Sequence, residues 1–379
     1  MKYIKKVLII AFAAMLALPL LFTNLKPGAI SEAENRALAT PAKLHNDDGT
    51  RNDNYLTDVS TWFNDNVGFR PQMVVQYARI QYYIFNNLFS KDFKLGPHGE
   101  WNWVSELVIP TYSHTLLYTE QDLESITKSV DVVNDYLSSQ GVQFYYMQCY
   151  DKQSIYPEYF PKSVNQYGPY SRTDQLMDTL SKDSSLNVID TKPDLVAAKK
   201  THECYSKFGD ATHWANPGAY IGYRQLMEDI NRNNNNEFRA LDESDYDLTP
   251  VDQGANMFGG VHKKDMIAPY TVKSPSAVST QAKFLIDHDS PNDKYFTNSA
   301  CGNNKKILIL GDSYIHLFIA DDIAESFGET IFLMRGHTDD IVNLVNEYHP
   351  DIVLFEQVER EQDLDVFDRA AANIQSAQQ

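Results

Sequence analysis

The sequence is poor in cysteine and in positive charge, and each shortage excludes a class of protein. Only three cysteines occur in 379 residues, Cys149, Cys204 and Cys301, and none forms a Cys-x-x-Cys pair. Zinc-ribbon and thioredoxin-type sites are therefore excluded, and one disulfide is the most the chain allows. Lysine and arginine total 33 against 51 aspartate and glutamate residues, so the formal net charge is −18. Such a surface repels nucleic acid, and no nucleic-acid partner is expected.

Common metal- and nucleotide-binding motifs are also missing. His202-Glu203 has no second histidine at the metalloprotease spacing, and no Gly-x-x-x-x-Gly-Lys-[Ser/Thr] segment occurs. We expect neither a metal nor an organic cofactor. Apolar residues make up 43% of the chain and aromatics 12%, enough for a sizeable core in one large domain or in a main domain with a smaller one.

The N-terminus carries a membrane-targeting pattern. Lys2, Lys5 and Lys6 precede an apolar run, residues 7–22, without a charge or a hydrogen-bonding side chain. This pattern is typical of a signal sequence, and its length is close to the about 20 residues that span a bilayer. No small-residue cleavage site follows closely, which favours an uncleaved anchor over a removed signal peptide; a buried helix is a third alternative. The positive flank stays inside, so we expect a single-pass cell-membrane protein with an extracytoplasmic domain.

Composition divides the rest of the chain. Residues 1–25 are the expected signal anchor or signal peptide, residues 26–115 a polar arm with a helical segment, and residues 116–379 an α/β domain. Within that domain, residues 231–304 begin with an Asn-rich run and hold many Pro, Gly, Ser and Asp residues. These residue types favour turns, so an irregular, loop-rich insertion is expected there.

Five short apolar runs in the α/β segment alternate with helix-like sequence. They are residues 142–147, 187–190, 307–310, 330–334 and 351–355. The three runs beyond residue 304 lack a polar face, as strands buried on both sides of a parallel sheet should. Helical periodicity over residues 121–140, stopped by Gly141, and similar sequence between the other runs complete the alternation. The sequence predicts a doubly wound, mainly parallel five-stranded sheet.

A candidate nucleophile follows one of these strands. Ligands of such sheets bind at the carboxyl ends of the strands, where residues 307–310 lead into Gly311-Asp312-Ser313-Tyr314 and then a helix. A serine at a helix N-terminus suits acyl transfer, because the developing oxyanion needs donors that are already aimed. Gly-Asp-Ser alone would occur by chance in roughly one chain of this length in ten. The alternative is a turn in which Asp312 and Ser313 only cap the helix.

A candidate base and its orienting acid lie a hundred residues earlier. Asp210 precedes His213 by three residues, in a loop before a helix that Asn216-Pro217 is expected to open. An acid at this spacing can turn back and accept from one ring nitrogen, which leaves the other nitrogen to face a hydroxyl. The alternative is a capping Asp210 with a half-buried His213 packed beside Trp214.

Together these motifs resemble the SGNH (GDSL-type) hydrolase superfamily, whose nucleophile is the serine of a strand-end Gly-Asp-Ser and whose last block is Asp-x-x-His. Here Asp210 and His213 precede Ser313, as in a circular permutation. This reversed order is similar to that of the alginate O-acetylation proteins and the DHHW family. Further segments that resemble this family are residues 31–38 (SEAENRAL), 63–70 (FNDNVGFR), 151–158 (DKQSIYPE) and 212–220 (THWANPGAY). The resemblance covers nearly the whole chain.

The resemblance implies roles for particular residues. Ser313 would be the nucleophile, His213 the base and Asp210 its orienter, although the family often has the acid two positions before the histidine, where this chain has Ala211. The superfamily adds a glycine after the second strand and an asparagine after the third to the oxyanion hole, and here those places hold Gly336 and Gln357. Arg335 either binds an anionic sugar group or forms a salt bridge. The candidate oxyanion and substrate-binding residues are Gly336, Gln357, Arg335, Asp312 and Tyr314.

The activity implied is O-acetylation of a cell-surface or secreted polysaccharide through an acetyl-serine. The resemblance also implies a polytopic membrane O-acyltransferase as the source of acetyl groups, because acetyl-CoA is not available outside the cell. Two alternatives remain. The same triad would serve a carbohydrate acetyl-esterase, and a site degenerate at Ala211 and Gln357 would suit a non-catalytic scaffold subunit of a polysaccharide assembly.

Overall fold

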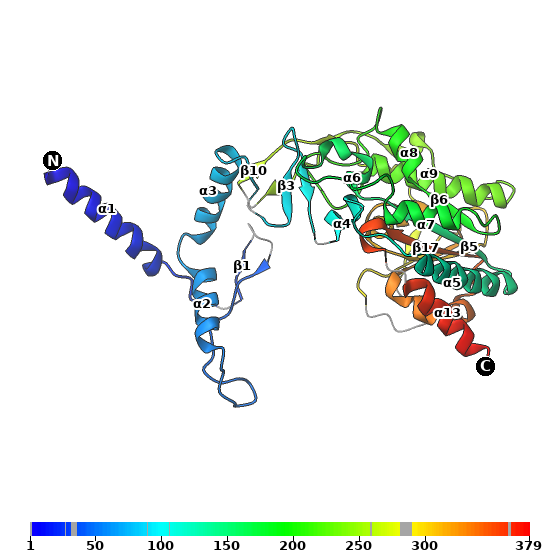
Figure 1. Cartoon of the computed structure of the whole chain (residues 1–379), viewed down its shortest axis with the longest axis horizontal. Coiled ribbons are helices and arrows are strands. Elements are labelled where there is room, and N and C mark those ends of the chain that lie inside the picture. The colour runs from blue at the N-terminus through cyan, green and yellow to red at the C-terminus, as the bar shows by residue number, and fades with distance from the viewer. Residues whose placement is uncertain are drawn as a thin grey trace. The chain divides into compact units, whose positions relative to one another are not determined.

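The computed structural model describes residues 2–26, 28–31, 36–88, 90–105, 107–257, 260–280, 290–362 and 365–379. The chain divides into two compact units (Figure 1). The N-terminal unit comprises Met1–Lys91 with Ala255–Lys263, and the α/β unit comprises Asp92–Gly254 with Lys264–Gln379. The finer division into anchor, arm and α/β domain, at residues 25 and 115, stays a prediction.

The N-terminal unit opens with α1 (Lys2–Leu21). Over Tyr3–Leu21 this helix is apolar and long enough to cross a membrane by length and composition, and none of that stretch is buried. The helix is compatible with the expected signal anchor. Two further helices follow, α2 (Tyr55–Asn66) and α3 (Arg70–Tyr83).

Two of the segments that carried the family resemblance meet in this unit. The Arg36 guanidinium donates to both oxygens of Asp65, at 2.8 and 2.7 Å, and the Ala39 N–H donates to the same carboxylate at 2.8 Å. These hydrogen bonds, led by that from Arg36, lower the pKa of Asp65 to about 2. The contacts tie the polar arm to the end of α2. Residues 32–35 of the first segment lie outside the described residues.

The α/β unit is built on a seven-stranded sheet. In spatial order its strands are β13 (Val278–Ser279), β14 (Lys294–Thr297), β16 (Glu329–Met334), β15 (Lys306–Gly311), β17 (Ile352–Val358), β5 (Gln143–Cys149) and β6 (Asn187–Asp190). The five strands from β16 to β6 are parallel. They correspond to the five predicted runs, so the predicted fold class is confirmed.

Two strands come from the segment that was expected to be loop. β13 and β14 add to the sheet in antiparallel orientation, next to β16. They are two and four residues long, too short to give a periodic signal among Pro, Gly and Ser residues. Pairing of β14 with β16, and of β13 with β14, fixes their strand conformation, and the expected five strands are therefore seven.

The sheet separates two cores because strand side chains alternate between its faces. On β15, Ile307 and Ile309 join one hydrophobic cluster, and Leu308 and Leu310 join the other. Helices α8 (Lys192–Ala198), α9 (Asn216–Asn233), α10 (Ser313–Phe318) and α11 (Ala320–Ala324) cover the first face. Helices α5 (Glu120–Ser139), α7 (Arg172–Leu180), α12 (Ile341–Tyr348) and α13 (Asp365–Ala377) cover the second. Figure 1 shows α9 and α5 on opposite sides of the sheet.

Local sequence explains several helix boundaries. Thr119 and Ser171 form capping boxes at the starts of α5 and α7. α9 departs slightly from expectation, since Ala215 is its N-cap and Asn216-Pro217 occupy its first turn. Pro217 still fits, because the first turn needs no intrahelical N–H donors. The single helix expected after Gly311-Asp312-Ser313-Tyr314 is divided into α10 and α11.

The remaining described elements are short. They are β1 (Ile30–Ser31), β2 (Arg36–Ala37), β3 (Phe93–Leu95), β4 (Trp101–Trp103), α4 (Val108–Tyr112), α6 (Lys152–Ile155), η1 (Pro157–Tyr159), η2 (Glu243–Asp245), β7 (Tyr246–Asp247), β8 (Val251–Asp252), β9 (Asn256–Met257), β10 (Val261–His262), β11 (Met266–Ile267), β12 (Thr271–Val272), η3 (Arg335–Asp340) and η4 (Glu359–Glu361).

Close packing between α9 and the loop before it generates a stability prediction. A methyl group at Gly222 would lie 2.6 Å from ring carbon Cζ3 of Trp214, a side chain with no exposed surface. Helix propensity alone would make Gly222→Ala stabilising by about 1 kcal/mol. We expect destabilisation by roughly 1–3 kcal/mol, because Trp214 has no room to move. Urea unfolding of the full-length protein measures the sign, with Glu228→Ala on the exposed side of α9 as control. A stabilised Gly222→Ala would contradict the packing argument.

Candidate active site

Ser313 lies at the carboxyl end of β15, as the first residue of α10. Its position is fixed by Asp312, which is 3% exposed and caps the helix. One Asp312 carboxylate oxygen accepts from the Tyr314 N–H at 2.8 Å, and the other accepts from the Val358 N–H at 2.9 Å. The Asp312 N–H donates to Glu356 Oε2 at 2.8 Å. The turn is thus tied to the neighbouring strand β17, and Ser313 remains half-buried at the sheet edge.

The loop before α9 brings the predicted acid and base together. Asp210 Oδ1 accepts from the backbone N–H of Thr212 at 2.8 Å and from the Thr212 hydroxyl at 2.6 Å. The other carboxylate oxygen, Oδ2, lies 2.7 Å from Nδ1 of His213. An aspartate that bonds the backbone two residues on makes a compact turn. The three-residue spacing therefore allows the acid to reach back to the ring.

His213 and Ser313 meet although 100 positions separate them in the chain. His213 Nε2 lies 2.8 Å from Ser313 Oγ. With Nδ1–H donating to Asp210, Nε2 is the acceptor for the serine hydroxyl, an assignment that follows from the hydrogen-bond network. Serine, imidazole and carboxylate form one hydrogen-bonded chain, which is the arrangement that activates a serine for attack on an acyl carbon.

Asp210 is held in its ionised form. Desolvation acts to raise the pKa of Asp210, but the hydrogen bonds from His213 and Thr212 and the charge of His213 outweigh it and lower that pKa to about 2. The carboxylate is therefore an acceptor at every pH near neutrality. This fixes the proton of the neutral imidazole on Nδ1, the tautomer that leaves Nε2 free to accept from Ser313.

Aromatic side chains surround the imidazole. The rings of Tyr314 and Phe318 have centroids 5.4 and 5.6 Å from that of His213. Tyr314 is fully buried and packs against Trp214, at 5.1 Å between centroids. This apolar wall keeps water from one side of the ring, and hydrogen bonds are stronger in a region of low dielectric.

A pocket is lined in part by residues that follow Ser313 on α10, although Ser313, His213 and Asp210 do not line it. It has a volume of about 270 Å³ and is lined by Tyr270, Thr271, Val272, Pro275, His316, Leu317, Phe318, Ala320, Asp321, Asp322 and Glu325. His316 and Leu317 are three and four residues beyond Ser313, so they share its face of α10. The Phe318 ring that lines the pocket also contacts His213. The pocket is therefore adjacent to the hydrogen-bonded chain.

The other predicted site residues are placed differently. Asp312 and Tyr314 are buried, at 3% and 0% exposure, and their contacts hold the turn and the His213 loop. Gln357 is 1% exposed, and its neighbours on β5 include Tyr146 and Gln148. The structure thus brings Ser313, His213 and Asp210 together. It places Asp312, Tyr314 and Gln357 in supporting or core positions. Substrate-binding roles for them stay predictions.

The remaining two predicted residues follow β16. Arg335 and Gly336 begin η3 directly after this strand. Their side chains lie outside the part of the chain that the structure describes. The backbone N–H of Gly336 as an oxyanion donor and Arg335 as an anion-binding residue stay predictions.

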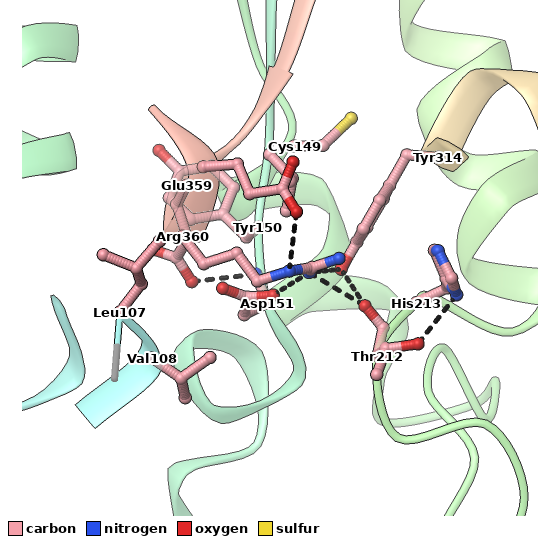
Figure 2. Close-up of polar contacts among 12 residues, drawn as sticks. Leu107, Val108, Cys149, Tyr150, Asp151, Thr212, His213, Tyr314, Glu359 and Arg360 are labelled. Atoms are coloured by element: carbon pink, nitrogen blue, oxygen red, sulfur yellow. Dashed lines mark hydrogen bonds and ion pairs between the residues drawn. The ribbon is translucent and has the colours of Figure 1, made fainter. Parts of the chain in front are cut away.

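One residue near the site was missed by the sequence reasoning. Arg360 lies in η4, and its Nη1 donates to the backbone carbonyl of Thr212 at 2.9 Å (Figure 2). The predicted last strand ended at Phe355, whereas β17 continues to Val358. The residues that follow the carboxyl end are therefore Glu359 and Arg360, not Glu356 and Gln357. In the sequence, the charged pair Glu359-Arg360 after this apolar strand was the signal that could have identified Arg360.

The fold and this hydrogen-bonded chain define an SGNH hydrolase-like protein. A family model described as the SGNH hydrolase-like domain of the acetyltransferase AlgX matches residues 112–343. The match extends over more than half of the chain, which belongs to this family. The resemblance inferred from the motifs is confirmed, and membership supports O-acetyltransferase activity in general. No curated protein sequence matches the chain.

One solved structure supports the fold, and two others are similar to this chain with lower scores. Bacillus cereus PatB1 with a sulfonyl adduct is 16% identical with a TM-score of 0.53, over 73% of this chain and 96% of that chain. A DHHW family protein from Eubacterium siraeum is 14% identical with a TM-score of 0.47, over 77% and 97% of the two chains. The O-acetyltransferase domain of Pseudomonas putida AlgJ is 13% identical with a TM-score of 0.46, over 75% and 99%.

The role of Asp210 in the hydrogen-bonded chain generates a prediction. Asp210→Asn preserves size, but the amide can donate to Nδ1 and so favour the tautomer that faces Ser313 with a donor. We expect the rate at which phenylmethylsulfonyl fluoride modifies Ser313 to fall by a factor on the order of 10²–10⁴. Because the pKa of Asp210 is lowered to about 2, the difference should persist from pH 5 to pH 9.

Labelling followed by mass spectrometry measures this rate, and Asp247→Asn, which removes the acceptor of a similar exposed turn at Thr249, is the matched control. Equal labelling of native protein and Asp210→Asn would show that the acid does not orient the ring.

Proposed function

We propose that this protein transfers acetyl groups to hydroxyls of a cell-surface or secreted polysaccharide through an acetyl-Ser313 intermediate. The observation that carries the proposal is the hydrogen-bonded chain from Ser313 Oγ through His213 to Asp210, at 2.8 and 2.7 Å. It occurs in a domain of an acetyltransferase family, whose relatives support O-acetylation of polysaccharides in general.

Two half-reactions would share the site. In the first, Ser313 Oγ attacks the acetyl carbonyl carbon while His213 Nε2 takes the serine proton; the bond from that carbon to the donor oxygen breaks, and the leaving group takes the proton from His213. In the second, a sugar hydroxyl gives its proton to His213 and attacks the acetyl-serine, and Ser313 Oγ leaves and regains a proton. Asp210 would stabilise the imidazolium in both steps.

An oxyanion forms in each half-reaction and needs donors. We assign this role to the backbone N–H of Ser313 and, as the second donor, to that of Gly336. The Ser313 N–H is available in the first turn of α10, because Asp312 accepts from Tyr314 instead. Preorganised backbone donors of this kind contribute on the order of 3 kcal/mol of transition-state stabilisation each.

The pocket beside Ser313 suits a sugar acceptor. Its wall combines the apolar side chains of Leu317 and Phe318 with the carboxyl groups of Asp321 and Asp322. A sugar ring offers an apolar face and hydroxyl donors, which match these two kinds of group. The acidic lining and the net charge of −18 favour a neutral polymer over a strongly anionic one.

The proposed setting is the outer side of the cell membrane, with α1 as an uncleaved tether. Acetyl-CoA is confined to the cytoplasm, so the acetyl group would reach Ser313 from a polytopic membrane O-acyltransferase. A tether raises the effective concentration of the two membrane proteins toward each other without a strong interface.

The test is transfer of acetyl from p-nitrophenyl acetate to neutral oligosaccharides, followed by mass spectrometry. Native protein should give acetylated product, and Ser313→Ala should lower the rate by a factor on the order of 10³–10⁶. Ser299→Ala, at an exposed serine, is the control. Acetate without acetylated oligosaccharide would favour an esterase, and equally slow release by native protein and Ser313→Ala would contradict catalysis.

A second prediction separates acceptor binding from the chemical step. Leu317 is 57% exposed and lines the pocket, so Leu317→Glu should fold normally but disturb the apolar wall. We expect KM for the oligosaccharide to rise about tenfold, equivalent to roughly 1.4 kcal/mol of binding, with p-nitrophenyl acetate hydrolysis unchanged. Leu117→Glu, at an exposed leucine ahead of α5, is the control. Unchanged oligosaccharide kinetics in Leu317→Glu would place the acceptor elsewhere.

A further inference from the structure

We propose that Arg360 is a positioning residue, which holds the imidazole of His213 on Ser313 by binding the backbone carbonyl of Thr212. This inference rests on the proposed function, because it concerns the same site. Arg360 lies in η4, directly beyond the carboxyl end of β17.

Figure 2 shows the guanidinium of Arg360 next to Asp151, Thr212 and Tyr314. Its Nη1 donates to the Thr212 carbonyl oxygen at 2.9 Å, and lies 3.4 Å from the Tyr314 hydroxyl oxygen. The Tyr314 hydroxyl itself donates to the Thr212 carbonyl oxygen at 3.1 Å. Two donors, on different elements, therefore converge on one carbonyl.

This carbonyl belongs to the peptide unit that precedes the candidate base. At the other end of that unit, the His213 N–H donates to Asp210 Oδ1 at 3.3 Å. A peptide unit is planar, so bonds at its carbonyl and its N–H together fix its orientation. The direction in which the His213 side chain leaves the backbone is fixed with it. Among the described residues, the hydroxyl of Tyr314 would be the remaining donor to this carbonyl without Arg360.

The guanidinium is oriented by its own neighbours. Nη1 forms an ion pair with Asp151 Oδ1, and both side chains are about 5% exposed or less. The charge lies 5.2 Å from the ring centroid of Trp103 and 5.4 Å from that of Tyr314. Burial raises the pKa of Glu359, which disfavours a second carboxylate anion close to Asp151.

A buried ion pair contributes little to the free energy of unfolding. The cost of removing both charges from water often cancels their attraction, and apolar residues of similar volume can replace such a pair without loss. The Asp151–Arg360 pair has a further use here, since it aims a donor at the loop of the candidate base. Displacement of a catalytic group by about 1 Å can cost a factor on the order of 10² in rate.

The test compares Arg360→Lys with a matched control at Arg172. Arg172 is also buried, and it donates to the carbonyls of Glu359 and Arg360 in the same segment. We expect Arg360→Lys to lower kcat for p-nitrophenyl acetate, and the rate of Ser313 sulfonylation, by about 10- to 100-fold with unchanged KM. Arg172→Lys disturbs the backbone of the same segment without removing the donor to Thr212, so it should lower both rates by less than Arg360→Lys does.

A second variant removes the risk of misfolding. Arg360→Lys shortens the side chain and removes the planar group whose Nη1 donates to both the Thr212 carbonyl and Asp151. A change to an apolar residue alone would leave Asp151 buried and unpaired. The double variant Asp151→Asn/Arg360→Met carries no buried charge at this place and still lacks the donor to Thr212. It should retain a cooperative unfolding transition and show the same loss of kcat.

A spectroscopic measurement separates failure of this inference from failure of the proposed function. In native protein the Nδ1 proton of His213 should give a downfield NMR signal, because it bonds Asp210. The signal should broaden or disappear in the double variant and persist in Arg172→Lys. Native rates and an unchanged signal in both Arg360 variants would overturn the positioning role, even if Ser313→Ala is inactive. If native protein has no acyl-transfer activity, the signal alone decides.

Discussion

The hydrogen bond between His213 and Ser313 depends on two loops that are far apart in the chain, and much of the α/β unit serves to hold those loops. Ser313 is fixed by the parallel strand β15 and by Asp312, whose carboxylate is anchored on β17. His213 is fixed by the turn of Asp210 and by the packing of Trp214 under α9. A distance of 2.8 Å tolerates little movement on either side, because hydrogen bonds weaken steeply with misalignment.

The acids of this site serve different purposes although they are close in sequence or space. Asp210 stays ionised, since donors surround its carboxylate. Asp312 uses both oxygens on backbone N–H groups and shapes the turn. Asp151 is withdrawn from water and pairs with Arg360. Burial and hydrogen-bond partners, rather than residue type, decide which carboxylate can take part in chemistry.

The N-terminal unit contributes an apolar helix and a polar arm. Its apolar helix is compatible with a tether, and the Arg36–Asp65 pair ties the polar arm to α2. Arg36 and Asp65, two of the motif residues there, contribute to the structure of this unit. In the proposed setting, α1 would hold the α/β unit at the membrane through which acetyl groups arrive.

The sequence by itself determined the alternating strands and helices, because buried parallel strands are continuous apolar runs such as residues 307–310. It also indicated Ser313, His213 and Asp210, since strand-end and loop motifs are local. The tertiary structure decided which strands pair and which residues far apart in the sequence come into contact. β14 is a strand because β16 lies beside it, and β13 is a strand because it pairs with β14. β17 runs three residues past its expected end because β5 continues next to it. Arg360 could be placed behind Thr212 only by the fold, since a contact across 148 positions leaves no periodic or local trace in the chain.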